Sequence, residues 1–376
     1  MKLSSLVMCS DEKIVRVLRR VLSDLEITME ACSDASEAIR VLTRHRFEAV
    51  IVDCVDEKQA SLVLKSARVA PCNKRAIAVA IIDGQTAVHG AFDLGAHFVL
   101  YKPISMERTK ASFRAARALM KRERRRNTRV PIQLSVGLVL GANEMRKRVA
   151  TTTSDLGEGG LALQTNERLA KAGKVQVEFT LPGSKERVTC DGEVAWENAG
   201  RQAGIRFVDL SAEVRTQLKN WVAQQSPEME ADDPPVRCRL TDLSPGSCYL
   251  ETATPFPATT RVLLGVSVSS PHVYGVVRVM HPESGMGVEF VQRTEEQREQ
   301  LEQFIQALMK NQDNLPELLV EADGLDSEPA PAGDGLNDPL TRLLRKKAAL
   351  PVEMFLKELR RQRGGATQPK EASFSI

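Results

Sequence analysis

The chain has 376 residues, of which 42% are hydrophobic and 27% are charged, and its formal net charge is +3. This length exceeds what one ordinary core holds, so it predicts two or three globular domains. The composition excludes a wholly disordered chain, and the near balance of charge excludes a broadly polyanion-binding protein. Any basic function must therefore be local.

The ends and the cysteines indicate the compartment. The apolar start of the chain is broken at Ser10 and Asp11, and no stretch approaches the roughly 18 to 20 apolar residues of a membrane span, so we expect neither a signal peptide nor stable membrane insertion. The seven cysteines are odd in number and form no C-x-x-C pair, which argues against a disulfide framework and a zinc site. These features predict a cytoplasmic protein.

Strands and helices alternate over the first part of the chain. Apolar runs predict strands at residues 6–9, 49–52, 76–82 and 97–100, and amphipathic patterns predict helices at 14–25, after 59, at 87–94 and from 106. This alternation indicates an α/β domain with a doubly wound parallel sheet. In such sheets the chemistry collects at the carboxyl ends of the strands.

Asp11, Asp53 and Lys102 stand at those carboxyl ends, and Lys102 is followed by proline in the run FVLYKPIS. In these features residues 1–122 resemble the response-regulator receiver family. The resemblance implies that Asp53 accepts a phosphoryl group, that Lys102 pairs with its oxygens, and that Asp11 and Asp53 hold a magnesium ion.

This domain departs from the receiver pattern in its acidic pair, which reads Ser10-Asp11. One carboxylate fewer is then available to a hard divalent cation, so magnesium is expected only if the receiver is active. The favoured interpretation is a pseudo-receiver that serves in partner docking or in formation of a homodimer.

A basic run follows, in which six of the nine residues from Lys121 to Arg129 are Lys or Arg. Such a run is typical of a solvated helix end, or of a patch that binds nucleic acid through its phosphates alone. The residues after it favour a different function.

Six short segments after Arg129 predict strands, at residues 131–140, 148–153, 160–164, 175–181, 188–196 and 203–208, and a helix follows at 212–222. Short strands with Gly and Pro turns indicate a small antiparallel barrel. Trp196 and Trp221 are predicted to be core residues.

Two motifs accompany this barrel. Arg125 and Arg129 match an R-x-x-x-R pattern, and the run DLGEGG at residues 155–160 matches (D/N)-x-S-x-x-G. In these motifs residues 123–226 resemble the PilZ family. The resemblance implies binding of cyclic di-GMP by Arg124, Arg125, Arg126, Arg129, Asp155, Gly157, Gly159 and Gly160.

The chemistry of the ligand suits these residue types. Each guanine offers O6 and N7 side by side, and a planar guanidinium can bond to that edge or to a phosphate with two donors, which lysine cannot do. Asp155 could accept a guanine N–H or orient an arginine, and glycines let the backbone approach closely. Gly157 stands where the family has serine, and the lost hydroxyl, worth about 0.5 to 1.5 kcal/mol, should weaken binding roughly tenfold.

The chain then repeats itself. The run DLSPGS at residues 242–247 repeats residues 155–160, and residues 287–291 repeat 204–208, so residues 227–312 form a second, degenerate PilZ-like barrel. The acidic run SPEMEADDPP stands where the arginine pair should be and would repel phosphates. Arg237 and Arg239 are expected to face outward on a strand. This barrel is predicted to bind protein, or its sister barrel, in place of nucleotide.

Two segments complete the chain. Residues 313–339 are acidic and rich in Pro, Gly and Ala, which predicts a flexible linker. Residues 340–376 have helical, basic and amphipathic patterns that predict a helical tail. Such a tail can pack back on its own protein, dock on a partner or lie on an anionic membrane surface.

The leading hypothesis is a non-enzymatic cyclic di-GMP effector of bacterial signalling, in which ligand capture reorients the receiver against the first barrel or promotes binding of an unidentified protein partner. The chain lacks a nucleophile–base pair, a Walker loop and metal-ligand spacing, so no enzyme is expected. The alternative is a phosphorelay-controlled or constitutive scaffold that binds no nucleotide. Nucleic-acid binding at the basic run is not expected, since aromatic residues are absent around it.

Overall fold

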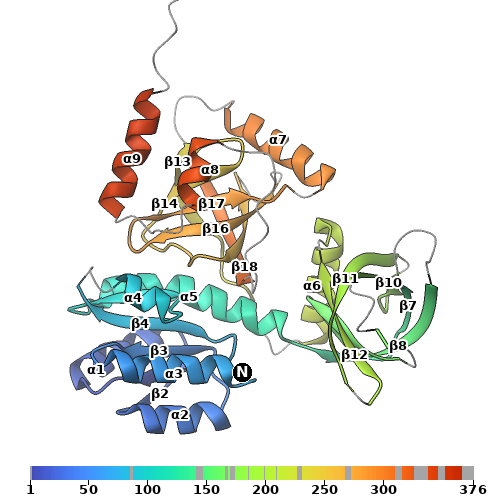
Figure 1. Ribbon diagram of the computed structural model, residues 1–376, viewed down its shortest axis with the longest axis horizontal. Helices are drawn as coiled ribbons and strands as arrows, with labels where there is room; N and C mark the ends of the chain where they lie inside the picture. Colours follow the sequence, from blue (N-terminus) through green and yellow to red (C-terminus); the bar gives the residue numbers. More distant parts are fainter. Residues whose placement is uncertain are drawn as a thin grey trace, which may run out of the picture. The chain divides into compact units, whose positions relative to one another are not determined.

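The structure is a computed structural model (Figure 1). It describes residues 2–84, 88–140, 147–165, 168–169, 174–184, 186–198, 200–208, 210–226, 231–266, 272–292, 294–309, 316–325, 338–345 and 352–365. The chain divides into two compact units, of which one spans residues 123–231 and the other joins residues 2–122 to residues from 232 onward. We call the first the PilZ-1 unit, because it holds the first predicted barrel, and the second the receiver–barrel unit.

The N-terminal domain is a five-stranded parallel sheet in the order β2-β1-β3-β4-β5. Its strands are β1 (Leu3–Met8), β2 (Ile27–Cys32), β3 (Ala49–Asp53), β4 (Ile77–Asp83) and β5 (Phe98–Lys102). Its helices are α1 (Glu12–Asp24), α2 (Ala35–Arg44), α3 (Glu57–Val69), α4 (Val88–Asp93) and α5 (Met106–Arg126). Apolar side chains of α1 and α5 cover one face of the sheet and those of α2 and α3 the other. The predicted doubly wound sheet is confirmed, and the 2-1-3-4-5 order is that of receiver domains.

The sequence pattern does not predict β2 and α2. Strand β2 lies at the edge of the sheet and pairs only with β1 among the described strands, so its side chains are half exposed and form no continuous apolar run. Helix α2 buries only Ala35, Ala38 and Leu42, and the two alanines give a weak apolar stripe.

The first barrel is the predicted antiparallel barrel. Its strands are β6 (Val130–Pro131), β7 (Ser135–Leu140), β8 (Lys147–Gly157), β9 (Gly160–Gln164), β10 (Lys174–Thr180), β11 (Arg187–Glu197) and β12 (Gln202–Val208), and helix α6 (Ala212–Gln225) follows. The sheet runs β6-β8-β7-β10-β11-β12-β9, and pairing of β8 with β9 closes it. Side chains of α6, including Trp221, contribute to its core.

The second barrel closes in the order β13-β14-β17-β16-β15-β18. Its elements are β13 (Val236–Leu243), β14 (Ser247–Glu251), β15 (Thr260–Gly265), β16 (Val273–His281), β17 (Gly285–Phe290), α7 (Glu295–Met309) and β18 (Glu317–Leu325). Matching β13 to β8 and β14 to β9 by their motifs, and the later strands in turn, gives the ring of the first barrel with β18 in the place of β7. The second barrel is thus a circular permutation of the first, with its first strand supplied last.

The predicted flexible linker at 313–339 is wrong over Glu317–Leu325, because these residues are β18. Leu318, Val320 and Ala322 are buried in the barrel, while Glu317, Leu319 and Glu321 alternate with them and are more exposed. Pairing with β13 and β15 holds the strand on both sides. The acidic composition of the segment concealed the alternation of buried and exposed residues that is typical of a strand. Residues 326–337 of the predicted linker lie outside the described residues.

The predicted tail helices are α8 (Pro339–Arg345) and α9 (Val352–Gly365). Both pack back on the second barrel, where their apolar side chains join Tyr249 in one buried cluster that includes Leu340, Leu343, Leu344, Phe355 and Leu359. No helix among the residues described above is long and apolar enough to cross a membrane.

Ion pairs join α5 to the second barrel inside the receiver–barrel unit. Asp233, from the acidic run before β13, accepts from Arg117 Nη1 at 2.5 Å and from Lys121 Nζ at 2.8 Å. Arg122 Nη2 lies 2.9 Å from Asp323 of β18. The acidic run that takes the place of the arginine pair therefore pairs with the basic side of the receiver helix.

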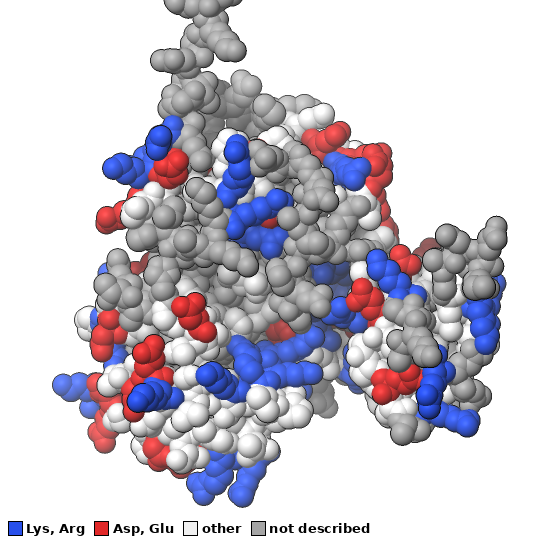
Figure 2. Space-filling model, viewed as in Figure 1, with Lys and Arg blue, Asp and Glu red and all other residues white. Residues whose placement is uncertain are grey.

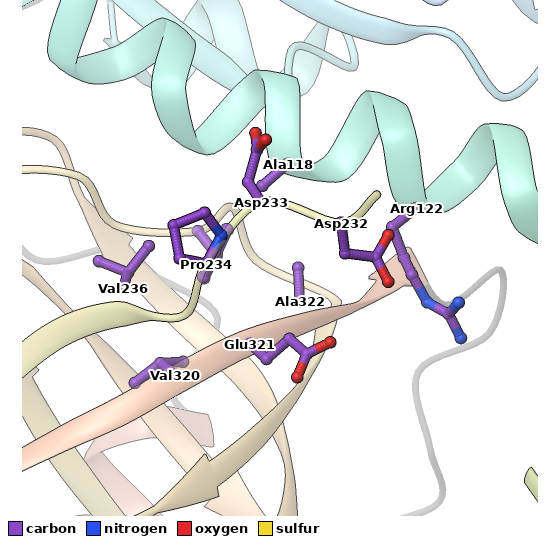
Figure 3. A pocket seen from close by; sticks show the side chains of 10 residues that line it. Ala118, Arg122, Asp232, Asp233, Pro234, Val236, Val320, Glu321 and Ala322 are labelled. Carbon is purple, nitrogen blue, oxygen red and sulfur yellow. The ribbon is translucent and has the colours of Figure 1, made fainter. Parts of the chain in front are cut away.

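The contact between α5 and the second barrel is filled by side chains. Figure 3 shows α5 passing over Asp232, Asp233 and Pro234, with Arg122 beside them. The pocket among these residues holds only about 10 Å³, the space of a single water. This surface is a packed interface within the unit and has no room for a nucleotide.

Replacing Asp323 tests this interface. Asp323→Ala removes an ion-pair partner of Arg122 and Arg261, and because the Arg122–Asp323 pair is nearly buried, we expect a loss of about 3 to 5 kcal/mol in the free energy of unfolding. Urea unfolding followed by far-UV circular dichroism measures it. Both tryptophans lie in the PilZ-1 unit, so their fluorescence transition should stay unchanged.

The matched control is Arg237→Ala, whose side chain is 76% exposed beside Glu317. It should change stability by no more than about 0.5 kcal/mol. Equal effects of the two variants would contradict a buried ionic interface.

Candidate functional site

The segment after the basic run is fixed to the strand that carries the aspartate–glycine motif. In the pairing of β6 with β8, Val130 lies opposite Leu156 and Pro131 opposite Asp155. The hydroxyl of buried Thr153 donates to the Ile132 carbonyl at 2.6 Å and accepts from the Leu134 N–H at 2.9 Å. This register sets the position of the residue just before β6, which is Arg129.

Arg129 faces the turn between β8 and β9. Its guanidinium donates to the carbonyl of Gly160, and its Nε lies 3.9 Å from Asp155 Oδ1. The Arg129 side chain is 45% exposed. The structure therefore brings together Arg129, Asp155 and Gly160 from the two predicted motifs.

Two glycines of the turn are required by close backbone approach. A Cβ on Gly157 would lie 2.6 Å from the Thr128 carbonyl oxygen and 3.1 Å from the Arg129 side chain. A Cβ on Gly160 would collide with the Ile205 carbonyl, whereas one on Gly159 would meet open space. The serine of the family pattern thus does not fit at position 157 unless the arginine segment shifts.

The other predicted arginines lie on α5. Arg125 is only 8% exposed, and its carbonyl accepts from the Thr128 N–H at 2.9 Å. Arg126 pairs with Glu123 at 3.3 Å, and the carbonyl of half-buried Arg124 accepts from the Thr128 hydroxyl at 3.0 Å. The structure thus holds Arg129 against the turn, and the other three arginines belong to the helix before it.

Trp196 is not a core residue, and that prediction is wrong. The side chain is 48% exposed, and its indole lies against Gly204 of β12, which pairs with β9. A register shift between Val194 and Trp196 turns the tryptophan outward, against the alternation that predicts it inside. An aromatic ring therefore lies on the sheet that carries the turn. Trp221 is buried as predicted.

The receiver-like domain brings Asp53 and Lys102 together at the carboxyl edge of its sheet. Lys102 Nζ lies 2.8 Å from Asp53 Oδ1, and Cys9 Sγ lies 3.3 Å from Asp53 Oδ2. Burial lowers the pKa of Lys102, but the hydrogen bond and charge of Asp53 outweigh it and leave the pKa above its usual value. Burial raises the pKa of Cys9 to about 11, so the thiol stays protonated at neutral pH.

Asp11 is used elsewhere, as the N-cap of α1. Its Oδ1 accepts from the N–H groups of Lys13 at 2.7 Å and Ile14 at 3.4 Å. The side chain that contacts Asp53 from the end of β1 is that of Cys9. Over the described ranges, no group of three or more His, Cys, Asp or Glu side chains could hold a metal ion. The residues present do not fit the expected magnesium site.

The chain has a receiver-like sheet followed by two six-stranded barrels whose strands have the same order around the ring. It is therefore a multidomain protein with a duplicated small barrel. The model of the PilZ domain family matches residues 123–224 and 225–307. The chain accordingly carries two PilZ domains in tandem. No curated protein matches the sequence.

Several solved structures are similar to one part of the chain. The receiver domain of the sensor histidine kinase PA1611 from Pseudomonas aeruginosa is 17% identical, with 32% of this chain and 98% of that one covered and a TM-score of 0.29. The chemotaxis response regulator CheY4 of Vibrio cholerae is 18% identical, with 31% and 99% covered and a TM-score of 0.29. The PilZ domain of CeSA from a cellulose-synthesizing bacterium is 18% identical, with 28% and 100% covered and a TM-score of 0.20.

The close approach at Gly157 generates a stability prediction. Gly157→Ala forces its Cβ against the Thr128 carbonyl, and we expect a loss of about 1 to 3 kcal/mol in the free energy of unfolding of the PilZ-1 unit. Tryptophan fluorescence during urea unfolding measures it. The matched control is Gly159→Ala, because a Cβ at that position has nothing within 4 Å. Its loss in the free energy of unfolding should be smaller than that of Gly157→Ala by at least about 1 kcal/mol. A Gly157→Ala variant as stable as the control would contradict the packing of the arginine segment on the turn.

Proposed function

We propose that the chain is a non-enzymatic effector of cyclic di-GMP in bacterial signalling, and that its first PilZ domain binds the dinucleotide. The observation that carries the proposal is the position of Arg129, whose side chain is half-exposed and whose guanidinium lies on the Asp155–Gly160 turn. Membership of residues 123–224 in the PilZ domain family supports the choice of ligand.

The chemistry at the turn fits this ligand. The guanidinium of Arg129 now donates to a neutral carbonyl, and a phosphate or the O6/N7 edge of a guanine would offer it a stronger acceptor. Asp155 can orient that guanidinium or accept a guanine N–H. The open side of Gly159 and the exposed face of Trp196 leave room for a base to stack.

Helix α5 supplies a route for the response. Its earlier turns are held by ion pairs of Arg117, Lys121 and Arg122 within the receiver–barrel unit, while Arg125 lies on its last turn in the PilZ-1 unit. Engagement of buried Arg125 by a ligand requires the last turn to rearrange. Helix α5 runs through both units, so a rearrangement of its last turn would act on both. The PilZ-1 unit would then reorient relative to the receiver, which is attached to the second barrel.

The charges of the basic run argue against a nucleic-acid site. Lys121, Arg122 and Arg126 pair with Asp233, Asp323 and Glu123, and paired cations release few counterions on binding a polyanion. On the face in view in Figure 2, Lys and Arg side chains and Asp and Glu side chains both occur, and some of the Lys and Arg side chains lie together near the centre of the view.

Isothermal titration of the full chain with cyclic di-GMP tests the proposal. Arg129→Ala removes a charged donor from the turn, and we expect its dissociation constant to rise about 10- to 100-fold. Arg125→Ala should weaken binding in the same direction, because the family pattern uses both arginines.

Arg148→Ala is the matched control. Arg148 lies on the same strand as the motif, and its side chain is 73% exposed beside Glu178. It should bind like the wild type. Equal, negligible heats from the wild type and from Arg129→Ala would end the proposal.

A further inference from the structure

The two barrels can be compared residue by residue on the face that carries the motif turn. Gly160 pairs with Arg206 in the first barrel, and Ser247 pairs with Glu289 at the matching place in the second. Two residues further along these strands, the pair of Ala162 with Gly204 matches the pair of Tyr249 with Gly287. This face is where the proposed function places the nucleotide on the first barrel.

On the second barrel, α8 covers that face. Thr341 Oγ1 donates to Ser247 Oγ at 3.0 Å, in a contact that is buried. A Cβ on Gly287 would collide with the side chain of Leu344, so the helix lies in direct contact with the strand backbone. The tail thus covers Ser247, which stands where the first barrel has its last motif glycine, and it also covers Gly287 on the neighbouring strand.

Charge complementarity holds the end of α8. Arg345 Nη2 lies 2.7 Å from Glu289 Oε1, and Arg278 Nε lies 2.8 Å from Glu289 Oε2. Glu289 is 9% exposed, and it stands where the first barrel has Arg206. A carboxylate repels phosphate and attracts a guanidinium, so this exchange suits a basic helix and disfavours a nucleotide.

Helix α9 extends the contact through aromatic packing. Phe355 lies 5.2 Å from Tyr249 and 4.6 Å from His281 between ring centroids, and the Tyr249 hydroxyl bonds His281 Nδ1 at 2.9 Å. Tyr249 stands where the first barrel has Ala162, so this face gained a large apolar surface that the tail buries.

We infer that the second PilZ domain is a helix-binding module whose occupant is this chain's own segment 338–345, seated where the sister domain is proposed to bind nucleotide. The recognised chemistry is a short helix with a hydroxyl, a leucine and an arginine on one side. The position of the nucleotide face rests on the proposed function, but the binding of the helix does not.

The test uses Arg345→Glu in the full chain, which sets two carboxylates against each other and leaves the barrel face unchanged. Loss of one such pair is worth about tenfold in an equilibrium, so hydrogen exchange of the amides of 338–345 should speed up about tenfold or more. Protection of β14 and β17 should stay as in the wild type, which shows that the barrel remains folded. Arg361→Glu, at an 82% exposed side chain on α9, is the matched control.

A labelled synthetic peptide of residues 338–365 then tests the vacated face by fluorescence anisotropy. It should bind the Arg345→Glu chain and fail to bind the wild type, whose own tail occupies the face. Unchanged exchange in Arg345→Glu, or faster exchange without peptide binding, would overturn the inference. Titration of Arg345→Glu with cyclic di-GMP should match the wild type, and a failure of the nucleotide proposal would leave the peptide result intact.

Discussion

The candidate site depends on one close approach, between the backbone at Thr128 and the strand at Gly157. Because position 157 has no Cβ, the segment before β6 can lie on β8 and bring Arg129 to the turn. A larger residue would push that segment away and separate the arginine from Asp155. The departure from the family serine is therefore more than a lost hydroxyl, because it permits the arrangement in which the Arg129 guanidinium donates to the Gly160 carbonyl.

Duplication gave the two barrels one ring order and different chemistry on the same face. The first keeps Gly160 and Arg206 there, whereas the second has Ser247 and Glu289 and holds a helix. Two acidic residues of the second copy pair with other parts of the chain, Asp233 with the receiver helix and Glu289 with the tail. On the face that carries the motif turn, Glu289 thus stands where the first barrel has Arg206, and it binds Arg345 of the tail.

Periodicity and motifs predicted much of the fold, including the parallel sheet, the six strands of the first barrel and the tail helices. They failed where local composition and tertiary role disagree. The strand β18 has linker-like acidity and becomes a strand only because the permuted barrel lacks its first strand. At the sites, spacing identified Arg129 with Asp155, but it could not reveal that a register shift turns Trp196 outward or that Asp11 caps a helix. These outcomes depend on backbone geometry that residue type does not encode.

The most direct test of the central claim is a crystal structure of the full chain with cyclic di-GMP bound. The account predicts the dinucleotide against the Asp155–Gly160 turn, with the Arg129 guanidinium moved from the Gly160 carbonyl to a phosphate or a guanine edge. It also predicts α8 in place on Ser247. A dinucleotide bound elsewhere on the chain, with Arg129 still on Gly160, would contradict it.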